Sequence, residues 1–167
     1  MISIVTNNDN LKESDMTEIV VRVKAILVNS NNEILLGYSH NDYQFPGGHV
    51  EENESLVDVL EREIKEETGI VIDIQKEKYF ATSIGYWKDH PKVGVNRKTI
   101  VYYFKIFTDL KPNLDNTSYD AGEIRGNYTL RYIPISDFEK VLSENAKIYG
   151  DRFGITKEMI TLSKKMK

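Results

Sequence analysis

The chain has 167 residues, of which 40% are apolar and 29% charged, and its formal net charge is −4. This composition is typical of a globular protein, so we expect one domain over residues 1–167, and the acidic balance argues against a stable nucleic-acid partner. The absence of cysteine excludes disulfides and thiolate metal sites and fits a reducing cytoplasm, while no apolar run reaches the length of a membrane span. The N-terminal stretch lacks the basic and long apolar regions of a signal peptide, so we expect a cytoplasmic protein with no membrane partner.

The first third of the chain predicts a β-hairpin. Residues 18–29 are dense in β-branched side chains, which is typical of a central strand. A Ser-Asn-Asn turn separates them from residues 33–38, which we expect to be the antiparallel partner. Residues 2–5 are compatible with a short edge strand. Residues 40–43 predict a polar loop, which leads into a tight turn, Phe45-Pro46-Gly47-Gly48.

An amphipathic helix is predicted after this turn. Ser55 is a suitable N-cap and Gly69 a suitable stop, because glycine readily takes the left-handed conformation that ends helices. Between them, apolar residues recur three or four positions apart, as one face of a helix requires, at Leu56, Val57, Leu60 and Ile64.

The second half of the chain alternates strands with loops and ends in helices. We expect one long or two short strands in 70–87, a loop at 89–96 and a strand at 97–108. A long loop without internal structure should follow at 111–127, and then a strand at 127–135. The chain should end in helices at 136–145 and 155–165, the first of which begins with a capping box from Ser136 to Glu139. This order of elements predicts an α/β sandwich with a mixed sheet.

Six carboxylates crowd into the fourteen residues from Glu54 to Glu67. Three of them, Glu63, Glu66 and Glu67, are spaced to project from one side of the predicted helix. Like charges at this spacing repel, whereas a hard divalent cation with oxygen ligands would turn the repulsion into attraction. Arg62 can pair with Glu66 four residues later and fix that carboxylate. The competing interpretation is a solvated acidic helix face.

The spacing of these residues favours the cation site. Gly48 is followed after five residues by Glu54 and after seven more by Arg62-Glu63-Ile64-x-Glu66-Glu67-x-Gly69-Ile70. This stretch, residues 48–70, resembles the complete signature of the Nudix hydrolase family, which includes the MutT-like enzymes. Asn53 stands where many members carry glycine, and asparagine tolerates the positive φ that such a turn needs.

The resemblance implies a Nudix-type α/β/α sandwich with a mixed β-sheet and a catalytic loop-helix-loop. It also implies metal-dependent hydrolysis of a nucleoside diphosphate linked to another moiety, with Mg²⁺ or Mn²⁺. By similarity, the metal ligands are Glu63, Glu66, Glu67 and the Gly47 carbonyl, while Arg62 orients the glutamates. Glu54 supports the site electrostatically.

Other site residues are less clearly marked. In this family a glutamate from a later loop often acts as metal ligand or general base, and Glu123 is the best placed candidate, with Asp120 as the alternative. Arg22 alternates with Lys24 on the first central strand and is a candidate for binding phosphates, although an outward polar face explains it equally well. Tyr86 lies at a spacing typical of members that act on dinucleoside polyphosphates and is a candidate for substrate binding.

Three functions follow from these observations. The first is an active pyrophosphohydrolase on nucleoside triphosphates or dinucleoside polyphosphates. Its expected partner is a nucleotide-type small molecule, and many relatives also form homodimers. The second is a Nudix-fold module that senses a nucleotide without cleaving it, which loss of the box glutamates would favour. The third is an acidic calcium-binding helix, against which the lack of an EF-hand loop argues.

Overall fold

The computed structural model describes residues 2–74 and 79–166, and seven strands of this part form one mixed sheet. The strands are β1 (Ile2–Thr6), β2 (Glu18–Val28), β3 (Glu33–Ser39), β4 (Asp42–Gln44), β5 (Ala81–Trp87), β6 (Arg97–Phe107) and β7 (Thr129–Pro134). The helices are α1 (Leu56–Thr68), α2 (Ala121–Arg125), α3 (Phe138–Tyr149) and α4 (Ile155–Lys164), with short 3₁₀ turns η1 (Glu13–Asp15), η2 (Leu114–Asn116) and η3 (Arg152–Gly154).

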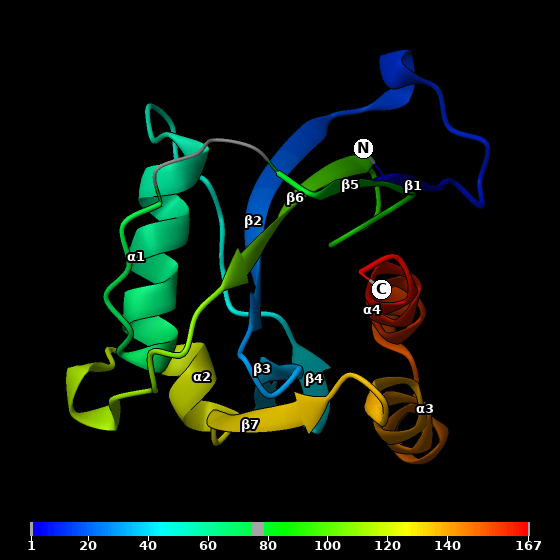
Figure 1. The fold of residues 1–167 in the computed structure, drawn as a ribbon. Helices are drawn as coiled ribbons and strands as arrows, with labels where there is room; N and C mark the ends of the chain where they lie inside the picture. The colour runs from blue at the N-terminus through cyan, green and yellow to red at the C-terminus, as the bar shows by residue number, and fades with distance from the viewer. Residues whose placement is uncertain (1, 75–78, 167) are drawn as a thin grey trace.

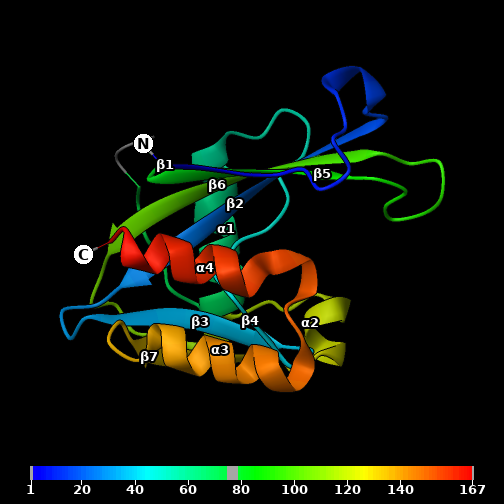
Figure 2. The same cartoon turned by 90° about the vertical axis from the view of Figure 1, so that its right-hand side faces the viewer.

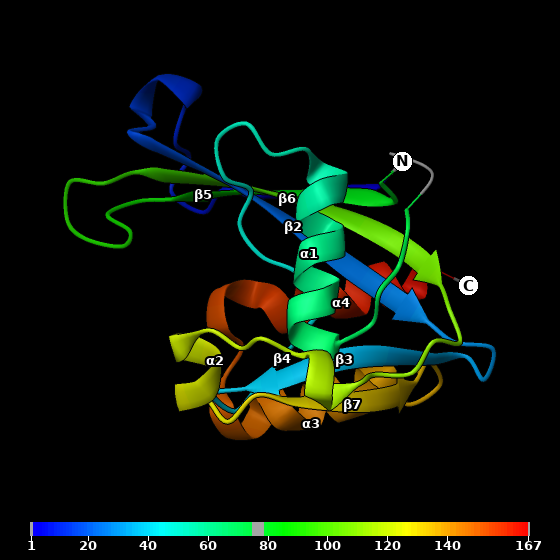
Figure 3. The same cartoon turned by 90° about the vertical axis from the view of Figure 1, so that its left-hand side faces the viewer.

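The sheet has the order β1-β5-β6-β2-β3-β4, and β7 pairs with the other edge of β3. Strand β2 runs parallel to β6 over eleven paired residues and antiparallel to β3. Helix α1 covers one face of the sheet, and α3 and α4 cover the other (Figures 1, 2 and 3). The predicted α/β/α sandwich with a mixed sheet is therefore confirmed.

The alternation of β2 divides the core between the two faces. Val23, Ala25 and Leu27 pack with the apolar side of α1, whereas Ile26 and Val28 belong to the cluster that α3 and α4 complete. Successive side chains of a strand point to opposite faces, so each face of β2 supports a different helical layer. Among the described helices, none is long and apolar enough to span a membrane.

Strand β2 leaves β3 after only two paired positions, Leu27 with Leu35 and Val28 with Ile34. Along the rest of that edge, the glycine turn takes the place of a strand. The Ala25 N–H donates to the Pro46 carbonyl (2.8 Å) and the Val23 N–H to the Gly48 carbonyl (3.0 Å). The turn that precedes α1 is therefore held by the central strand of the sheet.

The structure differs from the sequence prediction in four segments. The predicted loop at 40–43 is a tight hairpin turn into the short strand β4, and the long loop at 111–127 contains η2 and α2. Of the strands predicted within 70–87, only β5 is present in the described part, and 75–78 lie outside it. Helix α3 begins at Phe138 after Asp137, whose side chain makes no capping bond, so the predicted capping box at Ser136 is wrong.

Candidate active site

Helix α1 holds the acidic residues in fixed positions because both of its ends are capped. The Ser55 hydroxyl accepts a hydrogen bond from the Asp58 N–H (3.1 Å), and Asn53 just before it has a φ of 70°, as the sequence predicts. At the other end, Gly69 has a φ of 71° and donates to the Lys65 carbonyl (2.8 Å). The apolar side of the helix is buried against the sheet, so the carboxylates keep one orientation.

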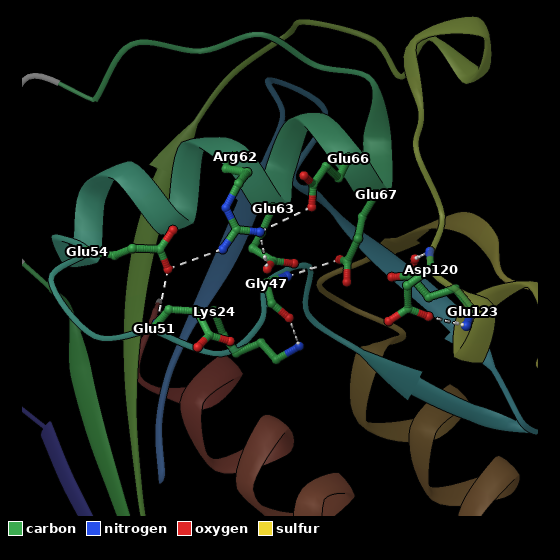
Figure 4. Close-up of polar contacts among 10 residues, drawn as sticks. All are labelled: Lys24, Gly47, Glu51, Glu54, Arg62, Glu63, Glu66, Glu67, Asp120 and Glu123. Carbon is green, nitrogen blue, oxygen red and sulfur yellow. Dashed lines mark hydrogen bonds and ion pairs between the residues drawn. The ribbon is translucent and has the colours of Figure 1, made fainter.

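Arg62 lies between three carboxylates of the acidic stretch (Figure 4). Its guanidinium is 2.8 Å from Glu63, 3.2 Å from Glu66 and 3.5 Å from Glu54. Burial raises the pKa of Glu63, and the charge of Arg62 partly offsets that increase. Arg62 therefore forms ion pairs that hold Glu63 and Glu66 beside its guanidinium.

Glu67 is the most buried carboxylate of the stretch, with 4% of its surface exposed. Its Oε2 accepts two hydrogen bonds, from the Gly47 N–H and from the Tyr128 hydroxyl, both at 3.0 Å. Burial raises the pKa of Glu67 to about 8, an effect that the nearby Lys24 ammonium opposes. Both donors bind the same oxygen, which leaves Oε1 without a hydrogen-bond donor among the described residues.

Lys24 brings a positive charge to the centre of the site. Its Nζ donates to the Gly47 carbonyl, the oxygen that the family resemblance names as a metal ligand. Burial lowers the pKa of Lys24, and the charge of Glu67 counteracts the shift. Figure 4 shows the lysine side chain reaching the glycine turn opposite Glu67.

Gly47 itself can be no other residue without a change in the backbone. Its φ is +133°, and a Cβ atom there would lie 2.2 Å from the Val23 carbonyl oxygen of β2. Its N–H is used by Glu67 and its carbonyl by Lys24. The turn thus presents one donor and one acceptor at the same point of the site.

Glu123 lies on α2 and reaches the same cavity as Glu63 and Glu67. A capping box fixes it: its carboxylate accepts from the Asp120 N–H (2.7 Å), and its own N–H donates to Asp120 Oδ1 (2.7 Å). In Figure 4 the carboxylates of Asp120 and Glu123 lie across the cavity from the helix. The structure therefore brings the predicted loop glutamate to the box carboxylates.

The remaining predicted residues are distributed differently. Arg22 lines the cavity, and its Nε is buried without a hydrogen-bond partner in the described part of the chain. Glu66 is bound to Arg62 and does not line the cavity. Tyr86 points away from it and donates a hydrogen bond to Glu13. The neighbouring Trp87 lies on the opposite face of the strand.

Sequence reasoning missed two residues of the site. Tyr128 is one of ten tyrosines, and no local pattern distinguishes it. Its hydroxyl binds Glu67, and its ring packs over Gly37, where a Cβ atom would lie 2.1 Å from the hydroxyl. Arg152 lines the cavity from η3. A glycine opposite a buried tyrosine was the one signal for Tyr128, and it becomes readable only with the fold known.

The donor groups of this site suit a hard divalent cation. Carboxylate oxygens of Glu63 and Glu67 and the Gly47 carbonyl face one cavity, and an ammonium group already lies on that carbonyl, so the site attracts positive charge. As they stand, the described residues contain no group of three or more His, Asp or Glu side chains that could hold a metal ion. In this arrangement Glu63 and Glu66 are both paired with Arg62.

Comparison with known proteins places this geometry in a family. A sequence model of the family described as NUDIX domain matches residues 19–151, which contain the whole acidic helix. A protein of Invertebrate iridescent virus 3, named a candidate hydrolase, 080R, is 38% identical over 65 residues, covering 38% of this chain and 27% of that protein. The chain thus spans about a quarter of the length of this relative.

Solved structures with a similar arrangement include two MutT proteins and one other hydrolase. A MutT from work on Aliivibrio salmonicida and Vibrio cholerae is 21% identical, with 85% of this chain and 96% of that chain covered and a TM-score of 0.46. The Bacillus halodurans MutT is 18% identical, with 72% of each chain covered and a TM-score of 0.48. The C. elegans Ap4A hydrolase is 15% identical, with 89% of this chain and 99% of that chain covered and a TM-score of 0.48.

Proposed function

The chain belongs to the NUDIX domain family, and from this membership we propose that it is an active pyrophosphohydrolase. Its substrate would be a nucleoside diphosphate linked to another moiety, such as a nucleoside triphosphate or a dinucleoside polyphosphate. The observation that carries the proposal is the position of Glu67, a buried carboxylate held by Gly47 and Tyr128 in a cavity that Glu63 and Glu123 also line.

A metal ion is part of this proposal. Glu63, Glu67 and the Gly47 carbonyl would hold Mg²⁺ or Mn²⁺, with Glu66 joining them if it leaves Arg62. When bound, the ion screens the phosphate charges and lowers the pKa of a bound water. Divalent cations of this hardness prefer oxygen ligands, and the ligands proposed here are all oxygen atoms.

The protein groups around the cavity divide the remaining tasks. Arg22, Lys24 and Arg152 line it with positive charge, which suits the phosphates of a substrate. Glu123 is rigidly held opposite the box glutamates and is our candidate for the general base that takes a proton from the attacking water. Arg62 acts indirectly by fixing the glutamates.

The test compares Glu67→Gln with the wild type in a release assay for phosphate and pyrophosphate with Mg²⁺. The panel of substrates comprises nucleotides, nucleotide sugars and dinucleoside polyphosphates. We expect the substitution to lower kcat at least about 100-fold, because an amide is a far weaker ligand for a hard cation than a carboxylate. Glu144→Gln, an exposed position on α3, is the matched control and should retain full activity.

The same assay separates catalysis from sensing. A protein that binds nucleotides but only senses them would show no turnover on any substrate of the panel. Turnover that Glu67→Gln leaves unchanged would remove Glu67 from the mechanism and contradict the proposal. A thermal melt of both variants shows whether a lost activity reflects a lost fold.

A further inference from the structure

A second cavity adjoins the active-site cavity on the face of the sheet that α4 covers. The two cavities share five lining residues, Arg22, Lys24, Gln44, Arg152 and Ile155. Figure 2 shows α4 lying in front of the sheet, and Arg152 of η3 and Ile155 at the start of α4 line both cavities. A molecule could therefore reach from the box glutamates into the second cavity past three basic side chains.

The second cavity is partly walled by aromatic rings. Trp87 lies over Gly85, where a Cβ atom would approach its indole nitrogen to 2.6 Å, so the glycine leaves room for the indole. The rings of Phe153 and Trp87 pack edge to face, with their centroids 5.4 Å apart and their planes at 72°. The centroid of the His90 ring lies 5.0 Å from that of Phe153. Such rings suit a flat heteroaromatic ligand.

The backbone of Phe153 has an unfavourable conformation. Its φ is +57°, in the left-handed region that favours glycine. A side chain in this conformation costs on the order of 1 kcal/mol and persists where surrounding structure or function requires it. Yet half of its surface remains exposed to solvent. Burial alone therefore does not explain why an aromatic residue occupies this position.

A carboxylate also lines the second cavity. Glu158 of α4 lines the cavity, and its Oε2 accepts from the Ser83 hydroxyl (2.7 Å) while its Oε1 accepts from the Tyr103 hydroxyl. Ser83 and Tyr103 are 5% and 6% exposed, on the adjacent strands β5 and β6. Each carboxylate oxygen retains acceptor capacity, so the group offers two acceptors side by side and no donor.

We propose that this cavity binds a guanine base and that Glu158 selects it. The proposal rests on the proposed function, since the base would belong to the nucleotide whose phosphates lie at the box glutamates. Guanine carries two adjacent N–H donors, N1–H and the N2 amino group, which match the two oxygens of a carboxylate. Adenine and cytosine place a ring-nitrogen acceptor beside their amino group, and uracil flanks its N3–H with two carbonyls, so each would face Glu158 with like charge.

The protein provides its own probe for this proposal, because Trp87 is its only tryptophan. Quenching of its fluorescence is measured during titration with GDP and, separately, with ADP, in EDTA so that no metal contributes. We expect GDP to quench the emission and to bind at least about tenfold more tightly than ADP. In Glu158→Gln, one acceptor becomes a donor, and the ratio of the affinities for GDP and ADP should fall to within about twofold of unity.

Controls separate this proposal from the hydrolase itself. Glu144→Gln should keep the wild-type ratio, and Glu67→Gln should keep it too, because Glu67 does not line the second cavity. Equal affinities for GDP and ADP in the wild type, no quenching by either, or a ratio that Glu158→Gln leaves unchanged would each overturn the proposal. Metal-dependent hydrolysis could still be observed in all three cases. Conversely, guanine-selective binding without turnover would contradict only the proposed function.

Discussion

Glu67 is held by groups from distant parts of the chain. The glycine turn supplies the Gly47 N–H, Tyr128 just before β7 supplies a hydroxyl, and β2 supplies the charge of Lys24. A buried carboxylate that lacks such partners would be costly to keep ionised. The network therefore explains how one acidic residue of the stretch can be buried.

At Gly47 the backbone of this network can be tested directly. We expect Gly47→Ala to lower the free energy of unfolding by about 2 kcal/mol or more, because the methyl group would meet the Val23 carbonyl while φ stays positive. Urea denaturation measures the change. Activity should fall as well, since a shifted turn moves both its N–H and its carbonyl away from Glu67 and Lys24.

Gly94→Ala is the matched control for that experiment. Gly94 also has a positive φ, +87°, but apart from its chain neighbours no atom of the described residues lies within 4 Å of where its Cβ would be. Gly94→Ala should therefore lower the free energy of unfolding by only about 1 kcal/mol, the cost of placing alanine at a positive φ. If the two variants lost the same stability, the close approach of the turn to β2 would play no part.

Among the elements, α2 has an importance out of proportion to its length of five residues. Such a short helix has little stability of its own, and its capping box is what fixes Glu123. We expect Asp120→Ala to lower kcat several-fold, because it removes the side chain that accepts the Glu123 N–H. Steady-state kinetics with Mg²⁺ and a substrate from the panel measure the effect.

A double-mutant cycle shows whether Asp120 acts through Glu123. In the Glu123→Gln background, Asp120→Ala should have almost no further effect, since the residue that it positions is already inactive. Effects that multiply would mean that the two residues contribute independently. Asp137→Ala is the control at another N-cap, one whose side chain makes no capping bond, and it should not change kcat.

Local patterns in the sequence predicted the long elements and the short edge strand β1, and failed on α2 and β4. The helix at residues 56–68 was readable from its apolar periodicity and its caps, and the catalytic box from its spacing. Helix α2 was missed although Asp120-x-x-Glu123 is a capping box, because five residues show no periodicity. Strand β4 was missed for the same reason, its three residues being too few for an alternation.

Most contacts between distant residues could not be predicted from local patterns. The hydroxyl of Tyr128 reaches Glu67 over 61 positions of sequence, and Glu158 meets Ser83 over 75. Neither pair belongs to a local pattern, so only the fold brings them together. The second cavity and the position of Trp87 in it depend on such contacts. Tyr86 was chosen instead for its spacing after the acidic helix, and it does not line either cavity.

At the scale of the whole molecule, β2 connects the two layers. One face packs with α1, which carries the box glutamates, and the other bears Arg22 and Lys24 beside the cavity under α4. The sheet opens where β2 parts from β3, and the glycine turn fills that opening. The proposed catalytic groups and the proposed base site thus meet at the one point where the sheet is interrupted.

The buried Glu67 should make the free energy of unfolding of the whole protein depend on pH. Its pKa is about 8 in the folded state and 4.5 in an unfolded chain, so between these values the folded state binds the extra proton. The contribution of Glu67 to stability is then most favourable below about pH 4.5 and is lost as the pH rises through 8. In EDTA, we expect this residue to lower the free energy of unfolding by a few kcal/mol, roughly 1.4 kcal/mol per pH unit within that window.

Urea denaturation of the wild type and Glu67→Gln at pH 5, 6.5 and 8 isolates this contribution, because every other titrating group is common to both proteins. From pH 5 to pH 8, the free energy of unfolding of the wild type should decrease relative to that of Glu67→Gln, because the amide of the variant has no proton to lose. Mg²⁺ should reduce the shift, since a cation at Glu67 stabilises the ionised carboxylate that burial disfavours. A difference that stays constant across the three pH values would mean that Glu67 is ionised throughout, with the charge of Lys24 outweighing the effect of burial.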